Sequence, residues 1–184
     1  MKQFKVGVVV GSIRQGSYSK MIADALIEVA PKNLDFEFLE IANLALYNQD
    51  YDAQSPDLYT EFRTKVSGLD AFVFVTPEHN RSIPAALKNA LDVASRPWGQ
   101  NVWNGKPAGV ISSSIGSLAG FGANHHLRQV LSFLNIPTMA QPEAYIGGTM
   151  GLFDENGKLT DDSTKQFLIN YGQAFAKWVE TIVS

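Results

Sequence analysis

Short, almost wholly apolar runs alternate with longer segments of helical periodicity along this chain. Residues 4–10, 71–75 and 107–112 contain few polar side chains, which is typical of strands buried on both faces of a parallel sheet. Between and after these runs, apolar residues recur every three or four positions, and that spacing predicts amphipathic helices. The helices are expected at residues 19–30, 57–68, 84–95, 121–134 and 160–183.

Two further strands complete the predicted sheet. Residues 36–41 form the second strand along the chain, and residues 138–146 contain a short edge strand. Alternating strands and helices favour an α/β fold, with a parallel sheet that carries helices on both faces. Five strands suit the doubly wound, flavodoxin-like order 2-1-3-4-5. Because no linker, internal repeat or low-complexity segment interrupts the pattern, we expect a single domain over residues 1–184.

The loop after the first strand has the composition of an anion-binding site. Residues 11–19 read Gly-Ser-Ile-Arg-Gln-Gly-Ser-Tyr-Ser and lead into the first predicted helix. Glycine lets backbone N–H groups converge, a helix N-terminus adds unpaired donors, and arginine binds phosphate oxygens as a fork. The alternative is a glycine turn with a solvated, serine-rich helix cap. The candidate phosphate-binding residues are Ser12, Arg14, Gln15, Gly16, Ser17, Tyr18 and Ser19.

Two common nucleotide-binding motifs are missing from this loop. Ser17 stands where a Walker A loop has lysine, and the Gly-x-Gly-x-x-Gly pattern of dinucleotide-binding loops is absent. The loop therefore lacks the machinery for hydrolysing a nucleoside triphosphate. It keeps the groups that bind one terminal phosphate.

Two more unusual loops are expected at the same edge, because the carboxyl ends of parallel strands lie together. Residues 76–84 follow the third strand and can present backbone polar groups to the edge of a flat heterocycle. Residues 112–120 follow the fourth strand, and their Ser and Gly residues allow close approach of a ligand. The alternative for residues 76–84 is a polar turn in which Ser82 is the N-cap of the following helix. The alternative for residues 112–120 is a flexible connection. The candidate binding residues are Pro77, Glu78, His79, Asn80, Ser114, Gly116 and Ser117.

Composition and charge exclude several functional classes. The formal net charge of −3 on 184 residues does not support general nucleic-acid binding. The lack of cysteine excludes a thiol nucleophile and any cysteine-ligated metal. His125 and His126 are adjacent on a predicted helix and point in different directions, so we expect no metal site. Since no signal peptide or membrane-spanning stretch is evident, a cytoplasmic location is expected.

These residues resemble a known family. Three segments are similar to signatures of the NAD(P)H-dependent FMN reductase family: residues 11–19, Pro-Glu-His-Asn-Arg-Ser-Ile-Pro at 77–84, and Leu-Lys-Asn-Ala-Leu-Asp at 87–92. The run His-Leu-Arg-Gln-Val-Leu at 126–131 resembles the family's bacterial quinone and chromate reductase branch. The resemblance covers nearly the whole chain. It implies that the first loop holds the phosphate of FMN, and that residues 77–80 and 114–117 border the isoalloxazine ring.

Some positions depart from the pattern that the resemblance suggests. The family commonly has Tyr where His79 stands and Asn where Ser19 stands, which would alter flavin packing and redox tuning. The bacterial branch often has Arg and Tyr where Gly122 and His125 stand, at positions where it makes subunit contacts. The resemblance implies a homodimer or homotetramer, and the second pair of departures bears on its tetrameric assembly.

The resemblance also implies a reaction. NADPH or NADH would donate a hydride to FMN, and a quinone would then occupy the same face of the flavin, which predicts ping-pong kinetics. Chromate, azo and nitro compounds are further candidate acceptors. Because the flavin carries the chemistry, we expect no catalytic side chain. The alternative is a flavodoxin-like electron-transfer protein that does not itself oxidise NAD(P)H.

Overall fold

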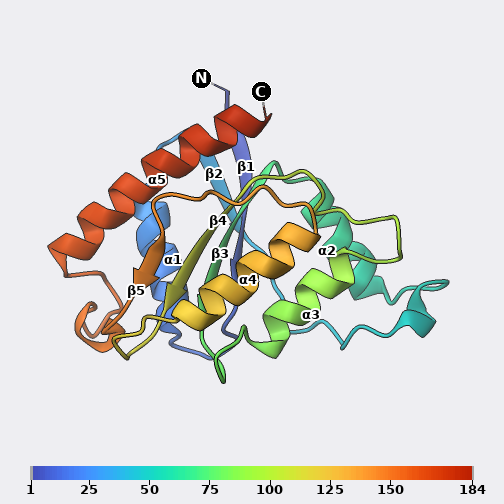
Figure 1. The fold of residues 1–184 in the computed structure, drawn as a ribbon, viewed down its shortest axis with the longest axis horizontal. Helices are drawn as coiled ribbons and strands as arrows, with labels where there is room; N and C mark the ends of the chain where they lie inside the picture. Colours follow the sequence, from blue (N-terminus) through green and yellow to red (C-terminus); the bar gives the residue numbers. More distant parts are fainter. Residues whose placement is uncertain (1, 184) are drawn as a thin grey trace.

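A computed structural model describes residues 2–183 and shows a five-stranded sheet in which all neighbouring strands are parallel (Figure 1). The strand order is β2-β1-β3-β4-β5, which confirms the predicted order. The strands are β1 Phe4–Val10, β2 Leu34–Phe38, β3 Ala71–Pro77, β4 Ala108–Ser113 and β5 Ala144–Ile146.

Helices cover both faces of the sheet. In Figure 1, α1 and α5 lie on one face, and α2, α3 and α4 lie on the other. The helices are α1 Tyr18–Val29, α2 Asp57–Ser67, α3 Ala85–Ala94, α4 Phe121–Phe133 and α5 Asp162–Val183, with short 3-10 helices η1 Gln49–Tyr51 and η2 Thr149–Gly151.

Two hydrophobic cores lie on opposite sides of the sheet, because successive side chains of a strand point to opposite faces. In β3, Phe72 and Phe74 pack into the core beneath α2, α3 and α4. Val73 and Val75 pack into the core beneath α1 and α5. Trp103 is fully buried in the first core, with its ring centroid 4.7 Å from that of Phe72. The central strands are therefore apolar throughout, as parallel strands buried on both faces should be.

The second strand begins and ends earlier than predicted. The expected strand covered residues 36–41, whereas β2 starts at Leu34 and ends at Phe38. Leu39 and Ile41 are buried, but they lie past the end of the strand and pack into the core beneath α2 and α3. Apolar residues in the following turn therefore extended the apparent strand pattern.

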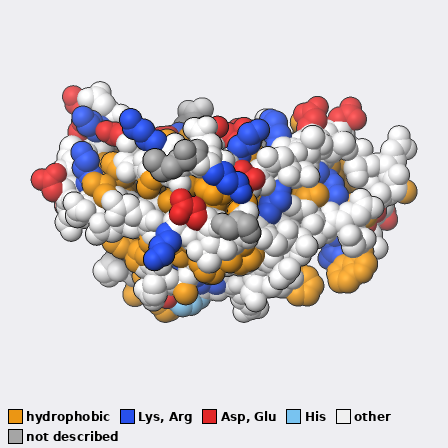
Figure 2. Space-filling view, turned by 90° about the horizontal axis from the view of Figure 1, so that it is seen from above, with side chains coloured by type: hydrophobic (Ala, Val, Ile, Leu, Met, Phe, Trp, Pro, Cys, Tyr) orange, Lys and Arg blue, Asp and Glu red, His pale blue; other side chains and the backbone are white. Residues whose placement is uncertain are grey.

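The carboxyl ends of the strands lie at the lower edge of Figure 1, and the two ends of the chain lie at the opposite edge. The loops after β1, β3 and β4 consequently share one edge of the sheet. Figure 2 views the molecule from the side of the chain ends, where positive and negative side chains are interspersed without a field of one sign. Within residues 2–183, no helix is long and apolar enough to cross a membrane.

Candidate functional site

A cleft of about 490 Å³ opens at the carboxyl edge of the sheet. Small-molecule sites typically span roughly 300–1,000 Å³. The loops after β1, β3 and β4 form its walls, and residues from the start of α3 and from η2 complete it. The three loops that the sequence singled out therefore meet in one site.

The first turn of α1 supplies free hydrogen-bond donors to the cleft. Ser17 precedes the helix, and its Oγ accepts a long contact of 3.5 Å from the backbone N–H of Lys20. Within residues 2–183, the backbone N–H groups of Tyr18 and Ser19 have no protein acceptor. Unpaired N–H groups at the positive end of a helix form an anion site. The start of α1 therefore has the free donors that an anion site needs.

A buried pair of serines fixes this turn to the sheet. The hydroxyl of Ser19 lies 2.9 Å from that of Ser113, the last residue of β4, and both side chains are buried. The hydrogen bond joins residues 94 positions apart in the sequence. The Ser19 hydroxyl thus bonds to the sheet, while its backbone N–H has no protein acceptor within residues 2–183.

Arg14 folds back across the same loop. Its Nη2 donates to the carbonyl of Gly16 at 2.7 Å, and its guanidinium carbon lies 5.8 Å from the centre of the Tyr18 ring. The side chain lines the cleft, and within residues 2–183 its other guanidinium N–H groups have no protein acceptor. A fork held in this way can still bind an anion at the helix terminus.

The loop after β3 is attached to α4 through the carboxylate of Glu78. Its Oε2 accepts a hydrogen bond of 2.9 Å from the backbone N–H of Ala123, in the first turn of α4. Its Oε1 accepts one of 2.8 Å from Nη1 of Arg81. Burial favours a raised pKa for Glu78, but these donors outweigh it and hold the pKa below its usual value. The carboxylate is thus ionised and fully engaged.

Gly122 makes this attachment possible. A Cβ at residue 122 would lie 2.9 Å from Oε2 of Glu78 and 3.2 Å from the carbonyl oxygen of Arg81. A larger residue would therefore displace the Glu78 carboxylate from the start of α4. The bacterial branch often has Arg at position 122. In this chain, glycine at that position leaves room for the Glu78 carboxylate to bond to the start of α4.

Thr149 contributes a polar group that lacks a partner. The residue begins η2, lines the cleft and is fully buried. Its Oγ1 has no hydrogen-bond partner, while its backbone N–H donates to the carbonyl of Ser114 at 3.3 Å. An unsatisfied buried hydroxyl is costly, and in native proteins it usually indicates a missing ligand or water. Thr149 therefore adds an unpaired hydroxyl to the residues that line the cleft.

Most of the predicted binding residues line the cleft. The loop after β1 provides the larger group, and the loops after β3 and β4 provide the rest. The residues that line it are Ser12, Arg14, Ser17, Tyr18, Ser19, Pro77, Glu78, His79 and Ser114.

Five predicted residues lie outside the lining. Gln15 faces a smaller neighbouring cavity of about 300 Å³, and Gly16 turns the loop with a φ of +64°. Asn80 lies at the tip of a tight turn with a φ of +51°. The carbonyls of Gly116 and Ser117 face Gly147 instead of the cleft. Composition indicated the loops that line the cleft, but it could not show which of their residues point away from it.

Sequence reasoning missed several lining residues. Apolar Ile13 and Ile115 lie within the predicted loops but carry no polar signal, and Ser113 is the last residue of β4. Thr149 lies outside the three loops that the sequence singled out. The available signal was its place directly after Gly147 and Gly148, which follow the fifth strand and so lie at the same sheet edge. The remaining missed residues are Gly11, Pro84, Ala85 and Ala86.

The two adjacent histidines have separate partners. Nε2 of His125 lies 2.9 Å from the hydroxyl of Tyr145, and Nδ1 of His126 lies 2.7 Å from the hydroxyl of Ser82. The alternative interpretation of this loop made Ser82 the cap of the third helix, but that helix begins after Pro84 and Ser82 bonds to α4 instead. Among residues 2–183, no group of three His, Asp or Glu side chains could hold a metal ion.

The role of Glu78 predicts a pH-dependent loss of stability. At pH 7, Glu78→Gln is expected to lower the free energy of unfolding by about 1–2 kcal/mol, because charged hydrogen bonds are replaced by neutral ones. The lowered pKa contributes stability above the unfolded value of about 4.3, and that stability is lost as the pH falls through the folded pKa. The difference between the two proteins should therefore shrink below about pH 4. Urea unfolding at pH 7 and at acid pH measures it.

Exposed Glu155 offers a matched control for this substitution. Glu155→Gln removes the same charge and should change the unfolding free energy by less than about 0.5 kcal/mol. A loss in Glu78→Gln that stayed constant down to acid pH would contradict the role given to the ionised carboxylate.

Comparison with known proteins agrees with this geometry. A quinone reductase from Pseudomonas putida is 52% identical over 178 residues, covering 96% of this chain and 95% of that protein. A 2-hydroxy-1,4-benzoquinone reductase from a Burkholderia species is 44% identical, covering 95% and 96%. The solved structure of the flavoenzyme FerB, an NAD(P)H:(acceptor) oxidoreductase from Paracoccus denitrificans, superposes with a TM-score of 0.91 at 37% identity, covering 97% and 98%. The NADPH-dependent FMN reductase family model matches residues 4–150, and this chain belongs to that family.

Proposed function

We propose that this protein holds FMN in its cleft, oxidises NADPH or NADH, and reduces quinones. The observation that carries the proposal is the convergence, in one cleft, of helix N-terminal donors, an arginine and a buried unpartnered hydroxyl. The relatives that are named quinone reductases support the choice of acceptor.

The residues present fit FMN. The free N–H groups of Tyr18 and Ser19, together with Arg14, suit a phosphate dianion at the start of α1. Pro77 and His79 line the opposite side of the cleft, where a flat ring would lie. The unpaired Oγ1 of Thr149 provides a further hydroxyl for the polar part of such a ligand. These groups support a phosphate site and a place for a planar group in the same cleft.

When bound, FMN supplies the hydride-accepting and hydride-donating chemistry. The side chains of the cleft position ligands and do not act as acids or bases. Glu78 is the carboxylate in the lining, and its oxygens are engaged with Ala123 and Arg81. A carboxylate that accepts two such hydrogen bonds at a lowered pKa is a poor general base. The chain's contribution is therefore orientation and electrostatics.

One open cleft serves both substrates in this proposal. Ile13 and Ile115 line it and are 62% and 63% exposed, so the mouth carries apolar side chains suited to flat, weakly polar molecules. Donor and acceptor would occupy this space in turn, which gives ping-pong kinetics. We extend the proposal to chromate, azo and nitro compounds as slower acceptors.

We also propose that the protein assembles as a homodimer or homotetramer. Leu118 lies in the loop after β4 and Phe121 begins α4, and their side chains are 60% and 54% exposed. Large exposed apolar side chains that gather near a site often mark an interface. Burial of this surface against a second copy would shield the apolar rim of the cleft from water.

The proposed activity has a direct test. Protein loaded with FMN is mixed with NADPH or NADH and 1,4-benzoquinone, and the loss of NAD(P)H absorbance is followed. We expect FMN-dependent oxidation, with parallel double-reciprocal plots at several quinone concentrations. Tight FMN binding without NAD(P)H oxidation would contradict the proposal and favour an electron-transfer protein.

Arg14 should distinguish FMN from riboflavin. Arg14→Ala removes a charged donor from the phosphate site, so the Kd for FMN should rise about tenfold. Riboflavin lacks the phosphate, and its Kd should change less than twofold. Quenching of flavin fluorescence measures both constants. Equal weakening of the two ligands would show that Arg14 does not contact the phosphate.

Thr149 should affect the empty and the loaded protein in opposite directions. Thr149→Val removes a buried hydroxyl without a partner and keeps the shape, so the FMN-free protein should be as stable as the wild type, or up to about 1 kcal/mol more stable. The Kd for FMN should rise about tenfold, because the ligand loses a hydrogen bond. Unfolding in urea and flavin titration measure the two effects.

Thr149→Ser is the matched variant, because it keeps the hydroxyl and removes the methyl group. It should retain FMN affinity within about twofold while losing roughly 1 kcal/mol of stability. If Thr149→Val bound FMN as tightly as the wild type, the hydroxyl would not be part of the binding site.

A further inference from the structure

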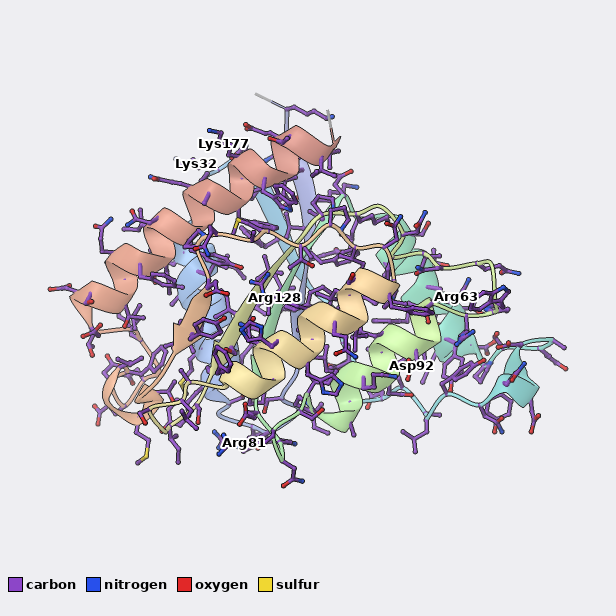
Figure 3. The ribbon with its side chains drawn as sticks, viewed as in Figure 1. Lys32, Arg63, Arg81, Asp92, Arg128 and Lys177 are labelled. Atoms are coloured by element: carbon purple, nitrogen blue, oxygen red, sulfur yellow. The ribbon has the colours of Figure 1, made fainter. Side chains whose placement is uncertain are left out.

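We propose that Arg81 binds a phosphate group of the nicotinamide dinucleotide at the rim of the cleft. The inference rests on the proposed function and names the group that recognises its reductant. Arg81 follows the stretch Pro77, Glu78 and His79, which lines the cleft, but Arg81 itself lies outside that lining. Figure 3 shows Arg81 on the loop at the carboxyl edge of the sheet, far from the labelled Lys32, Lys177 and Arg63.

Arg81 occupies a backbone conformation that suits glycine better. His79 and Ser82 exchange two backbone hydrogen bonds of 2.9 Å, which closes a two-residue turn over Asn80 and Arg81. The φ angles of Asn80 and Arg81 are +51° and +64°. Such turns favour Asn followed by Gly, because a side chain is strained at the second position. The presence of arginine here indicates that its side chain has a role that outweighs the strain.

Glu78 holds the guanidinium of Arg81 in one place while leaving most of it free. One carboxylate oxygen accepts from Nη1 at 2.8 Å, yet the Arg81 side chain is 70% exposed. Within residues 2–183, Nε and Nη2 of Arg81 have no protein acceptor. A guanidinium anchored on one nitrogen and open on the others is preorganised for a phosphate.

The Glu78 carboxylate is shared between Arg81 and the start of α4. The carboxylate of Glu78 is also stabilised by the N-terminus of α4, through the N–H of Ala123. Within residues 2–183, the cleft lining holds no other carboxylate. A phosphate at Arg81 would therefore meet no second negative side chain in the lining.

The turn is also held on its far side. The hydroxyl of Ser82 lies 2.7 Å from Nδ1 of His126 on α4. With Glu78 bonded to Ala123, the turn is joined to α4 both before and after Arg81. The guanidinium is therefore presented by a rigid segment, which lowers the entropy lost on binding.

The reductant is the ligand that matches this position. The phosphate of FMN has its own site at the start of α1 with Arg14, and a quinone carries no phosphate. The dinucleotide carries a pyrophosphate, and NADPH adds a 2′-phosphate. It also enters and leaves through the open side of the cleft, where Arg81 lies exposed. Comparison of NADPH with NADH separates the two possible phosphate sources.

Arg81→Gly is the decisive variant, because glycine relieves the strained turn and removes the guanidinium. With the FMN-loaded enzyme and benzoquinone, its kcat/KM for NADPH should fall about tenfold. The value for reduced nicotinamide riboside, a donor without phosphate, should stay within twofold of the wild type. An equal fall with NADH assigns the contact to the pyrophosphate, and a fall with NADPH alone assigns it to the 2′-phosphate.

Two comparison variants complete the experiment. Arg81→Lys should recover part of the NADPH activity, since it keeps the charge. Lys177→Gln on α5 removes one positive charge far from the cleft (Figure 3) and should leave every donor unchanged. If Arg81→Gly retained wild-type kcat/KM for NADPH, or lost activity equally with the phosphate-free donor, the inference would be wrong.

A binding measurement keeps this test separate from the proposed function. Adenosine 2′,5′-bisphosphate carries phosphates but no nicotinamide, so its affinity for the FMN-loaded protein does not depend on turnover. Calorimetry should show binding to the wild type and a Kd raised about tenfold in Arg81→Gly. Absence of binding to the wild type, or equal affinity in both proteins, would overturn the inference even if the enzyme oxidises NADPH. Failure of the wild type to oxidise NAD(P)H would instead contradict the proposed function.

Discussion

The carboxylate of Glu78 is the interaction on which the geometry of the site depends. It joins the loop after β3 to the first turn of α4 and, through its second oxygen, fixes Arg81. Without it, the segment that lines one wall of the cleft would lose its hydrogen bond to the first turn of α4 and keep the Ser82–His126 bond. This arrangement also needs glycine at position 122, because Gly122 leaves space for the Glu78 carboxylate. One side chain thus positions a wall, a helix terminus and a cation at once.

The opposite wall is fixed by a different device. There, the hydroxyls of Ser19 and Ser113 meet in a buried hydrogen bond that joins α1 to β4. Here the side chain of Ser19 serves the fold while its backbone N–H stays free for a ligand. A doubly wound sheet favours such bonds, because the ends of adjacent parallel strands bring distant segments within hydrogen-bond distance. The site is therefore rigid on both sides before any ligand arrives.

The fold and the loops of the site could be predicted from local patterns, since buried parallel strands and helix periodicity are properties of short segments. The β2 boundary could not, because Leu39 and Ile41 are buried in a turn and carry the same apolar signal as a strand. Residue-level detail in the site also escaped prediction. The inward bond of Ser19 and the unpaired hydroxyl of Thr149 depend on contacts between segments far apart in the sequence. Asn80 is placed by a local turn that His79 and Ser82 close, a conformation that its polarity alone did not reveal. Polarity shows that a side chain needs a partner but not where that partner lies.

The unpaired hydroxyl of Thr149 has a consequence for the protein's lifetime in the cell. A buried polar atom without a partner raises the free energy of the empty fold, and a ligand that satisfies it relieves that penalty. Binding of this kind shifts the folding equilibrium by mass action, in proportion to the ratio of free ligand to Kd. Molecules that have not acquired the cofactor would open more often and be degraded sooner. The abundance of this protein would then follow the supply of flavin, with no dedicated regulator.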